Sequence, residues 1–290
     1  MKTFLFVLMQ HLLPQHLISR AIGRLASSHN HFVRTRFIGW FVRRYNVNMS
    51  EAAEPDPGAY ENFNNFFTRP LKPGARPIAG GSDTVVCPAD GAISQIGAIE
   101  DNVIFQAKGR SFTVEALLGG DRALAQPFYG GQFATVYLSP RDYHRVHMPL
   151  EGTLLRTIYV PGKLFSVNKV TAENVDALFA RNERLVCFFD TAAGPMVVVL
   201  VGAMIVAGIE TVWAGHVCPT PGQNLVSTDY SEKPAISLGK GDEMGRFKLG
   251  STAIVLFAPG AMKMDPELKA DAPVRMGQKL GTLAGAETTR

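Results

Sequence analysis

Short apolar runs follow one another along the chain from about residue 85 onward. They are rich in valine, isoleucine, leucine and phenylalanine, and glycine, proline, aspartate or asparagine bounds them, which is typical of β-strands separated by turns. The clearest runs cover residues 92–99, 133–138, 153–160, 185–189 and 252–257. Helical patterns are few in this region: residues 114–118, where Thr113 is placed as an N-cap, and residues 172–180. The pattern predicts an α+β fold in which the larger part is mainly β.

The first 50 residues have a different pattern. Apolar residues recur there at helical spacings of three and four, and arginines lie among them. The apolar positions are Leu5, Leu8, Leu12, Ile18, Ile22, Leu25, Val33, Phe37, Trp40 and Phe41, and the arginines are Arg20, Arg24, Arg34, Arg36, Arg43 and Arg44. We expect an amphipathic helical arm over residues 1–50, a short polar linker, and one β-rich domain over residues 51–290.

The charge of the chain is concentrated in this arm. The net charge is +4, yet residues 1–50 carry seven lysines or arginines and no acidic residue, so the remaining residues are slightly acidic. Arginines interleaved with aromatic and apolar side chains suit a helix lying in the headgroup region of an anionic membrane. Two alternatives stay open: the arm packs on its own domain, or it binds nucleic acid, for which its apolar share is large.

Two segments could be mistaken for membrane or export signals. Residues 191–209 carry no charge over 19 positions, which is close to the length of a membrane-spanning helix. Proline and glycines interrupt the segment and valine dominates it, so two buried strands at 196–201 and 203–206 are favoured. The apolar run at residues 3–9 ends at Gln10 without a small-residue cleavage site, and we expect it to be retained.

His144 and His147 are the first candidates for chemistry, because they stand three residues apart in a block flanked by two prolines. Such a pair can ligate a metal, but no third ligand stands out in a metal motif, and we predict no metal site. Histidine is also the usual general base at neutral pH. The cysteines are sparse, odd in number and without metal-ligand spacing, which favours buried free thiols: Cys87, Cys187 and Cys218.

A base needs a group to activate, and the peptide bond between Gly250 and Ser251 is a candidate. Glycine leaves its carbonyl carbon open to attack, so the Ser251 hydroxyl could convert this amide to an ester. Asp90, which precedes a glycine, could orient a histidine and stabilise its charged form. Each of these residues has a more common structural explanation, as a turn residue.

Taken together, the blocks are far more specific. They are Phe66-Phe67-Thr68-Arg69-Pro70-Leu71-Lys72, Pro88-Ala89-Asp90-Gly91, Asp142-Tyr143-His144-Arg145-Val146-His147 and Leu249-Gly250-Ser251-Thr252, with two further matches at residues 159–168 and 182–184. In order and spacing this set closely resembles the bacterial phosphatidylserine decarboxylases. The resemblance covers nearly the whole chain, and no motif position departs from it.

The resemblance implies a proenzyme whose β-rich catalytic domain cuts itself between Gly250 and Ser251. The products would be a β chain (1–250) and an α chain (251–290), with Ser251 converted to a covalent pyruvoyl group. By the same resemblance Asp90, His147 and Ser251 carry out self-processing, and His144 acts as the acid in decarboxylation. The pyruvoyl group would form a Schiff base with phosphatidylserine and release CO2 to give phosphatidylethanolamine.

The resemblance also implies where the protein works and with what. The substrate is phosphatidylserine in an anionic membrane, and the protein would be peripheral, on the cytoplasmic face of the cell (inner) membrane. The β and α chains would form a heterodimer, which could pair further, and no nucleic acid would be bound. Two rivals stay open: a Ser–His–Asp hydrolase, although Ser251 lacks the Gly-x-Ser-x-Gly context of such enzymes, and a purely structural membrane-surface module.

Overall fold

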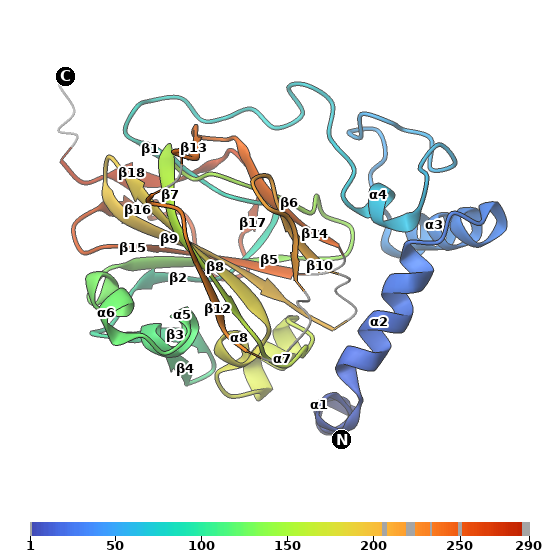
Figure 1. Ribbon diagram of the computed structural model, residues 1–290, viewed down its shortest axis with the longest axis horizontal. Coiled ribbons are helices and arrows are strands. Elements are labelled where there is room, and N and C mark those ends of the chain that lie inside the picture. The colour runs from blue at the N-terminus through green and yellow to red at the C-terminus, as the bar shows by residue number, and fades with distance from the viewer. Residues whose placement is uncertain (1, 205–207, 219–223, 233, 249–250, 286–290) are drawn as a thin grey trace.

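A nine-stranded antiparallel sheet forms the centre of the part of the protein that the structure describes (Figure 1). The structure, a computed structural model, describes residues 2–204, 208–218, 224–232, 234–248 and 251–285. The strand order is β12 (Val226–Asp229), β7 (Gly152–Val160), β8 (Arg184–Thr191), β9 (Gly194–Gly202), β15 (Ser251–Phe257), β5 (Gln132–Leu138), β2 (Gly91–Ala98) and β17 (Pro273–Val274), while β13 (Ser237–Leu238) also pairs with β7.

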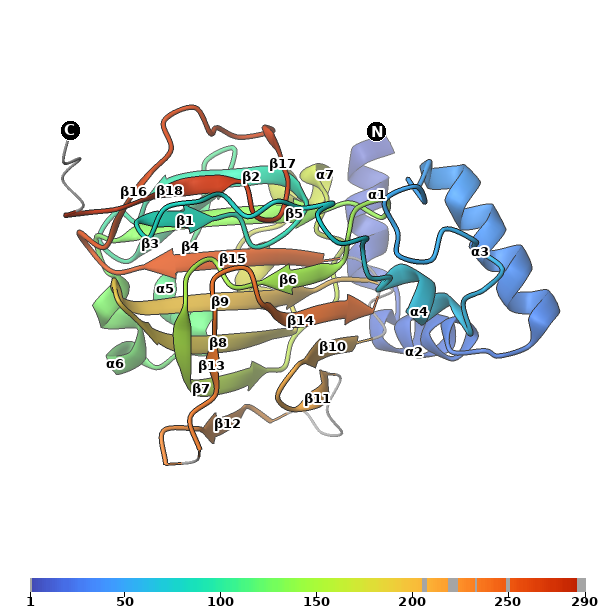
Figure 2. The same ribbon diagram turned by 90° about the horizontal axis from the view of Figure 1, so that it is seen from above.

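Smaller sheets cover one side of this central sheet (Figure 2). One has the order β11 (Gly215–Cys218), β10 (Gly208–Thr211), β14 (Glu243–Lys248) and β6 (Arg145–His147). A second consists of β1 (Thr84–Val86), β18 (Lys279–Leu283) and β16 (Met262–Met264). The hairpin of β3 (Val103–Ala107) and β4 (Arg110–Thr113) lies on the other side of the central sheet, next to α5 (Figure 1).

Both faces of the central sheet are buried, because successive side chains of a strand point to opposite faces. In β15 and β9, Val255 and Val198 pack into one apolar cluster beneath the smaller sheets. Their neighbours Ile254 and Val199 pack into a second cluster on the other face, with the helices after β4. The uncharged run at residues 191–209 is therefore largely a central strand, and no helix among the described residues is long and apolar enough to span a membrane.

The helices lie in two groups, one at an end of the β body and one on the second face of the central sheet (Figure 1). Three of them form the N-terminal arm at one end, and the short α4 packs against this group (Figures 1 and 2). The helices are α1 (Lys2–Leu12), α2 (Gln15–Ala26), α3 (His31–Tyr45), α4 (Phe63–Phe67), α5 (Val114–Leu118), α6 (Arg122–Ala125), the 3-10 turn η1 (Gln126–Phe128), α7 (Lys169–Asn174) and α8 (Leu178–Arg181). The predicted α+β, mainly β fold with a helical N-terminal arm is confirmed.

One predicted helix was wrong as a continuous element. Residues 172–180 were expected to form one helix, but α7 ends at Asn174 and α8 begins at Leu178, with Ala177 in the left-handed region at φ 48°. The buried Gln106 side chain explains the break: its amide donates to the carbonyls of Ala172 and Val175 at 2.8 Å, and its oxygen accepts the Leu178 N–H. The strand expected at 203–206 lies partly outside the described residues, and β10 begins at Gly208.

Candidate active site

The start of β15 is the point where the candidate segments meet. Ser251 pairs with Leu138 on β5 and with Gly202 on β9, so it stands between the ends of two central strands. The expected cleavage bond itself, with Leu249 and Gly250, lies outside the described residues, as does the Ser251 side chain.

Asp90 reaches this point from the other side of β5. It immediately precedes β2, whose Ala92 pairs with Tyr137, next to Leu138. Gly91 allows the close approach of the two strands, because a Cβ at this position would lie 2.1 Å from the Tyr137 carbonyl oxygen. No side chain larger than hydrogen fits there, so the Asp-Gly pair is required by packing as well as by turn geometry.

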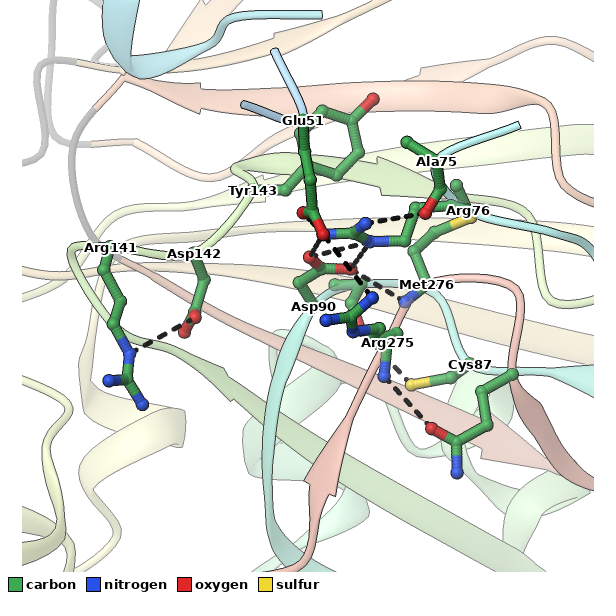
Figure 3. Close-up of polar contacts among 12 residues, drawn as sticks. Glu51, Ala75, Arg76, Cys87, Asp90, Arg141, Asp142, Tyr143, Arg275 and Met276 are labelled. Carbon is green, nitrogen blue, oxygen red and sulfur yellow. Dashed lines mark hydrogen bonds and ion pairs between the residues drawn. The ribbon is translucent and has the colours of Figure 1, made fainter. Parts of the chain in front are cut away.

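The Asp90 carboxylate is held by a buried cation. Arg76 Nε donates to both Asp90 oxygens at 2.8 and 2.9 Å, and the Met276 main-chain N–H donates to Asp90 Oδ1 at 2.9 Å. Glu51 accepts from the same guanidinium at 2.8 Å, and Figure 3 shows Arg76 between the two carboxylates. Burial opposes the charge on Arg76, but its hydrogen bonds to Asp90 and Glu51 outweigh burial and raise its pKa.

His147 is adjacent to the Asp90 segment but has other side-chain partners. Its main-chain N–H donates to the Pro88 carbonyl at 2.8 Å. Its Nδ1 lies 2.8 Å from the Gly241 carbonyl, which can only accept, so Nδ1 carries the proton and Nε2 accepts from the Tyr143 hydroxyl at 3.0 Å. Burial lowers the pKa of His147, which keeps the imidazole neutral and its Nε2 unprotonated at neutral pH.

The structure therefore brings Asp90 and His147 into neighbouring segments without a hydrogen bond between their side chains. The negative charge of Asp90 still acts on His147 through space, in the direction that raises its pKa. The residue that orients the imidazole is Gly241, through its carbonyl, and not the expected aspartate.

His144 lies deeper than His147 and has a different environment. It is fully buried, its ring stacks on Phe67 with 3.9 Å between centroids, and its Nε2–H donates to the Ser139 carbonyl at 3.1 Å. Burial, followed by the nearby positive charge of Arg69, lowers the pKa of His144 to about 3. Its Nδ1 is covered and has no partner among the described residues. Because Ser139 follows Leu138, which pairs with Ser251, this neutral imidazole lies beside the start of β15.

The two histidines do not form a metal site in the described part of the chain. His144 precedes β6 and His147 ends it, so they lie on no common helix face. Among the described residues no group of three or more His, Cys, Asp and Glu side chains is placed to hold a metal ion. Cys87 and Cys187 are buried free thiols, as expected, and the Cys218 side chain lies outside the described residues.

Hydrogen bonds also connect the N-terminal arm to this site. The Asn182 amide donates to the carbonyls of Gly202, the partner of Ser251, and of Phe165 at 2.9 and 2.8 Å. The segment around Phe165 is held in turn by the arm, since the Gln15 side chain accepts from the Leu164 N–H at 2.7 Å.

The arm itself has two faces. Gln10 accepts from the Ser166 N–H at 3.0 Å, so the junction of α1 and α2 packs on the domain. The opposite face leaves apolar side chains exposed, among them Phe4, Leu5, Leu8, Leu12 and Leu17. Packing on the domain and a free apolar face therefore coexist.

Sequence reasoning missed several residues of the site. Arg76 and Glu51 lie in loops where no periodicity marks them, and the Gly241 role rests on a main-chain carbonyl that any residue could supply. Tyr143 was visible as a member of the histidine block, and its place directly before His144 was the one available signal.

Comparison with known proteins gives the relationship of the chain. The family model described as phosphatidylserine decarboxylase matches residues 63–282, and a model described as PSD matches residues 5–46. The chain belongs to the phosphatidylserine decarboxylase family. A phosphatidylserine decarboxylase proenzyme of Pseudomonas putida is 60% identical over 288 residues, which are 99% of this chain and 100% of that protein.

Other relatives agree. Proteins with the same name from Ectopseudomonas mendocina and Pseudomonas aeruginosa are 61% and 62% identical over 97% and 96% of this chain, and over 99% and 97% of their own lengths. The resemblance that the motifs indicated is confirmed at the level of the family.

Proposed function

We propose that this chain is a self-processing phosphatidylserine decarboxylase, a carboxy-lyase that converts phosphatidylserine to phosphatidylethanolamine and CO2. The observation that carries the proposal is the meeting of Ser251, Asp90, His144 and His147 segments at the start of β15, in a member of this family. Neither an isolated turn serine nor a structural module would need that convergence.

In self-processing, His147 Nε2 would exchange its hydrogen bond from Tyr143 for the proton of the Ser251 hydroxyl, and the serine oxygen would attack the Gly250 carbonyl carbon. The neutral Nδ1–H tautomer held by Gly241 supports this role, because it directs the lone pair to Nε2. The nearby Asp90 charge would stabilise the imidazolium that forms. Elimination from the ester then frees the Gly250 carboxylate, and water releases ammonia from residue 251, leaving the pyruvoyl group.

The surroundings of residue 251 are compatible with such a carbonyl-bearing group. Thr252 Oγ1 and His144 Nδ1 are covered and lack partners among the described residues. The Thr252 hydroxyl can donate to an added carbonyl oxygen, while Nδ1, as an acceptor, can receive an N–H of the substrate. A pyruvoyl group supplies an electrophilic ketone and accepts the electron pair that CO2 leaves behind. The residues proposed to act around this group are Asp90, His144 and His147, and Ser251 is the residue that would be converted to it.

His144 would transfer a proton during decarboxylation, although its imidazole is not protonated beforehand. With a pKa of about 3 it is neutral at neutral pH, and its Nε2–H is engaged by Ser139. We infer that Nδ1 accepts a hydrogen bond from the substrate N–H group and passes this proton to the α-carbon after CO2 leaves, when the carbanion is a far stronger base than the imidazole. This refines the expected role of His144 and keeps the residue at the decarboxylation step.

The cut chain would remain assembled as a heterodimer of residues 1–250 and 251–290. β15 is paired on both edges, with β5 and with β9, and these main-chain hydrogen bonds do not depend on the cleaved bond. The exposed apolar face of α1 and the basic arm support peripheral binding to an anionic membrane, and we propose the cytoplasmic face as its location.

A denaturing gel combined with a decarboxylation assay tests the proposal. The purified full-length chain should give two fragments and release CO2 from phosphatidylserine, and Ser251→Ala should give one uncut, inactive chain. Two fragments from Ser251→Ala would indicate an outside protease. If the unchanged chain gives a single band and hydrolyses esters, the Ser–His–Asp hydrolase would be favoured instead.

A further inference from the structure

A basic cavity of about 440 Å³ lies between α2, α4 and the end of β14. Its wall includes Arg20 and Arg24 from α2, Asn64 from α4, His216 from β11 and Lys248 from β14. The volume is in the range of small-ligand pockets, roughly 300–1,000 Å³. None of these five residues belongs to the catalytic set described above.

The two arginines are the cations in this wall that are available to bind an anion. They stand four residues apart on α2 and therefore on one side of the helix. Neither has a hydrogen-bond or ion-pair partner for its side chain among the described residues, whereas Lys248 pairs with Glu210. Burial, followed by the charge of Lys248, lowers the pKa of His216, so this ring is a neutral hydrogen-bonding group at neutral pH.

Asn64 adds a polar group without a full set of partners. Its Nδ2 donates to Ser27 Oγ at 2.9 Å, while its Oδ1 is covered and has no donor among the described residues. A buried acceptor without a donor is costly and indicates a missing polar ligand or ordered water. The wall thus offers cations for an anion and an acceptor for an N–H or O–H group.

The cavity adjoins the strand end that precedes the reacting residue. Lys248 precedes Ser251 by three residues, so their Cα atoms are at most about 11 Å apart at 3.8 Å per residue. In a serine phospholipid four bonds of roughly 1.5 Å separate the phosphorus from the amine nitrogen. These four bonds span about 5 Å when extended, so a phosphate held at the Lys248 end of the cavity would direct the amine toward residue 251.

We propose that Arg20 and Arg24 bind the phosphodiester of the substrate phospholipid in this cavity and so position its amine at residue 251. Guanidinium groups suit this ligand, because their N–H groups form paired hydrogen bonds to phosphate oxygens. The inference rests on the proposed function for the identity of the substrate. The arginines act as binding and positioning residues, with no part in proton transfer.

The same two charges could instead serve only as contacts to an anionic membrane surface. A soluble substrate separates the two, because dihexanoyl phosphatidylserine below its micelle concentration offers a headgroup without a surface. For the full-length, self-processed enzyme we expect Arg20→Gln and Arg24→Gln each to raise the KM for this substrate about tenfold, equivalent to about 1.4 kcal/mol. The kcat should stay within about twofold, since the loss is in binding.

Arg122→Gln is the matched control. Arg122 is an exposed arginine of α6 that is not in the cavity wall, and it should leave both constants unchanged. Glycerophosphoserine should inhibit the wild type competitively, and the double variant Arg20→Gln/Arg24→Gln should lose this inhibition. Inorganic phosphate should inhibit much more weakly.

Three results would overturn the inference. An unchanged KM for the soluble substrate, with weaker vesicle binding, would leave the arginines as membrane contacts only. Equal inhibition by inorganic phosphate and glycerophosphoserine would assign the cavity to free phosphate. If Arg122→Gln raised the KM as much as the cavity variants do, the effect would come from total charge and not from the cavity.

The test also separates the inference from the proposed function. If the unchanged chain is neither cut nor active, the proposed function fails, and the cavity is then tested by direct binding. Titration of glycerophosphoserine into the uncut Ser251→Ala chain should show binding that Arg20→Gln/Arg24→Gln abolishes, and absence of binding to the parent Ser251→Ala chain would contradict the inference by itself.

Discussion

Replacing Arg76 by methionine tests the ion-pair cluster that holds Asp90. The Arg76 side chain is only 7% exposed, and it is the shared partner of Asp90, 9% exposed, and Glu51, 25% exposed. Methionine retains much of the apolar length of the side chain but removes the charge and the hydrogen-bond donors. Asp90 would keep one main-chain N–H donor, from Met276.

The size of the effect follows from burial. Removing one partner of a buried ion pair leaves the other charge uncompensated and costs about 3–5 kcal/mol. An exposed pair is worth about 0–1 kcal/mol, because water screens it. Arg156 and Asp229 form such a pair, at 2.8 Å and with 38% and 50% exposure, so Arg156→Met is the matched control.

Urea unfolding in the uncut Ser251→Ala background measures both variants on a single chain. We expect Arg76→Met to lower the free energy of unfolding by about 3–5 kcal/mol and Arg156→Met by less than about 1 kcal/mol. In the chain with Ser251 present, Arg76→Met should also slow self-cleavage, because Asp90 is no longer fixed beside the His147 segment. Equal, small losses for the two variants would refute the assignment of Arg76 as the buried anchor of Asp90.

Three further outcomes are expected. His147→Ala should block self-cleavage on a denaturing gel, while His144→Ala should still be cut at least in part but decarboxylate poorly; the opposite pattern would reverse the two roles. Because His144 has a folded pKa of about 3 against an ordinary 6.5, the unfolded chain takes up a proton below pH 6.5 that the folded chain does not. Its contribution to stability should therefore fall by about 1.4 kcal/mol for each pH unit below that value, and a His144→Gln variant with an unchanged slope in pH-dependent unfolding would contradict this. The third change replaces the exposed Leu5, Leu8 and Leu12 by glutamine. It should weaken sedimentation with phosphatidylglycerol vesicles without loss of self-cleavage. Undiminished sedimentation would place the membrane contact elsewhere.

Local patterns predicted most of the strands because the strands are defined by local features. The run expected at 133–138 is β5 with one residue added, and the run at 252–257 is β15 with Ser251 added. The short helix at 114–118 was predicted with its cap, since Thr113 accepts from the Ala116 N–H at 3.1 Å. Apolar runs, turn residues and caps all act within a few residues, so the sequence contains them directly.

The elements that were missed depend on distant residues. The break between α7 and α8 is caused by Gln106, whose side chain bonds Ala172 across 66 positions of sequence. His147 and its orienting carbonyl at Gly241 are 94 positions apart. No local pattern indicates either contact, because the partner is a main-chain group that carries no signature of its own.

The candidate site shows the same division. Motifs identified segments that lie near one another around the start of β15, but they did not indicate which hydrogen bonds their residues make. Asp90 was expected to bind His147 and instead binds Arg76, so its influence on the imidazole is electrostatic. Its role in self-processing stays a prediction, for which Arg76→Met and Asp90→Asn are the probes.

The intact mass of the small fragment tests the central claim most directly. If the chain cuts itself and converts Ser251, the fragment should have the mass of residues 251–290 less one ammonia, because the pyruvoyl group replaces the amino-terminal serine. Mild reductive amination should then add to that fragment and to no other. A fragment with the full mass of a peptide that begins with serine, or a cut at any other bond, would contradict the account.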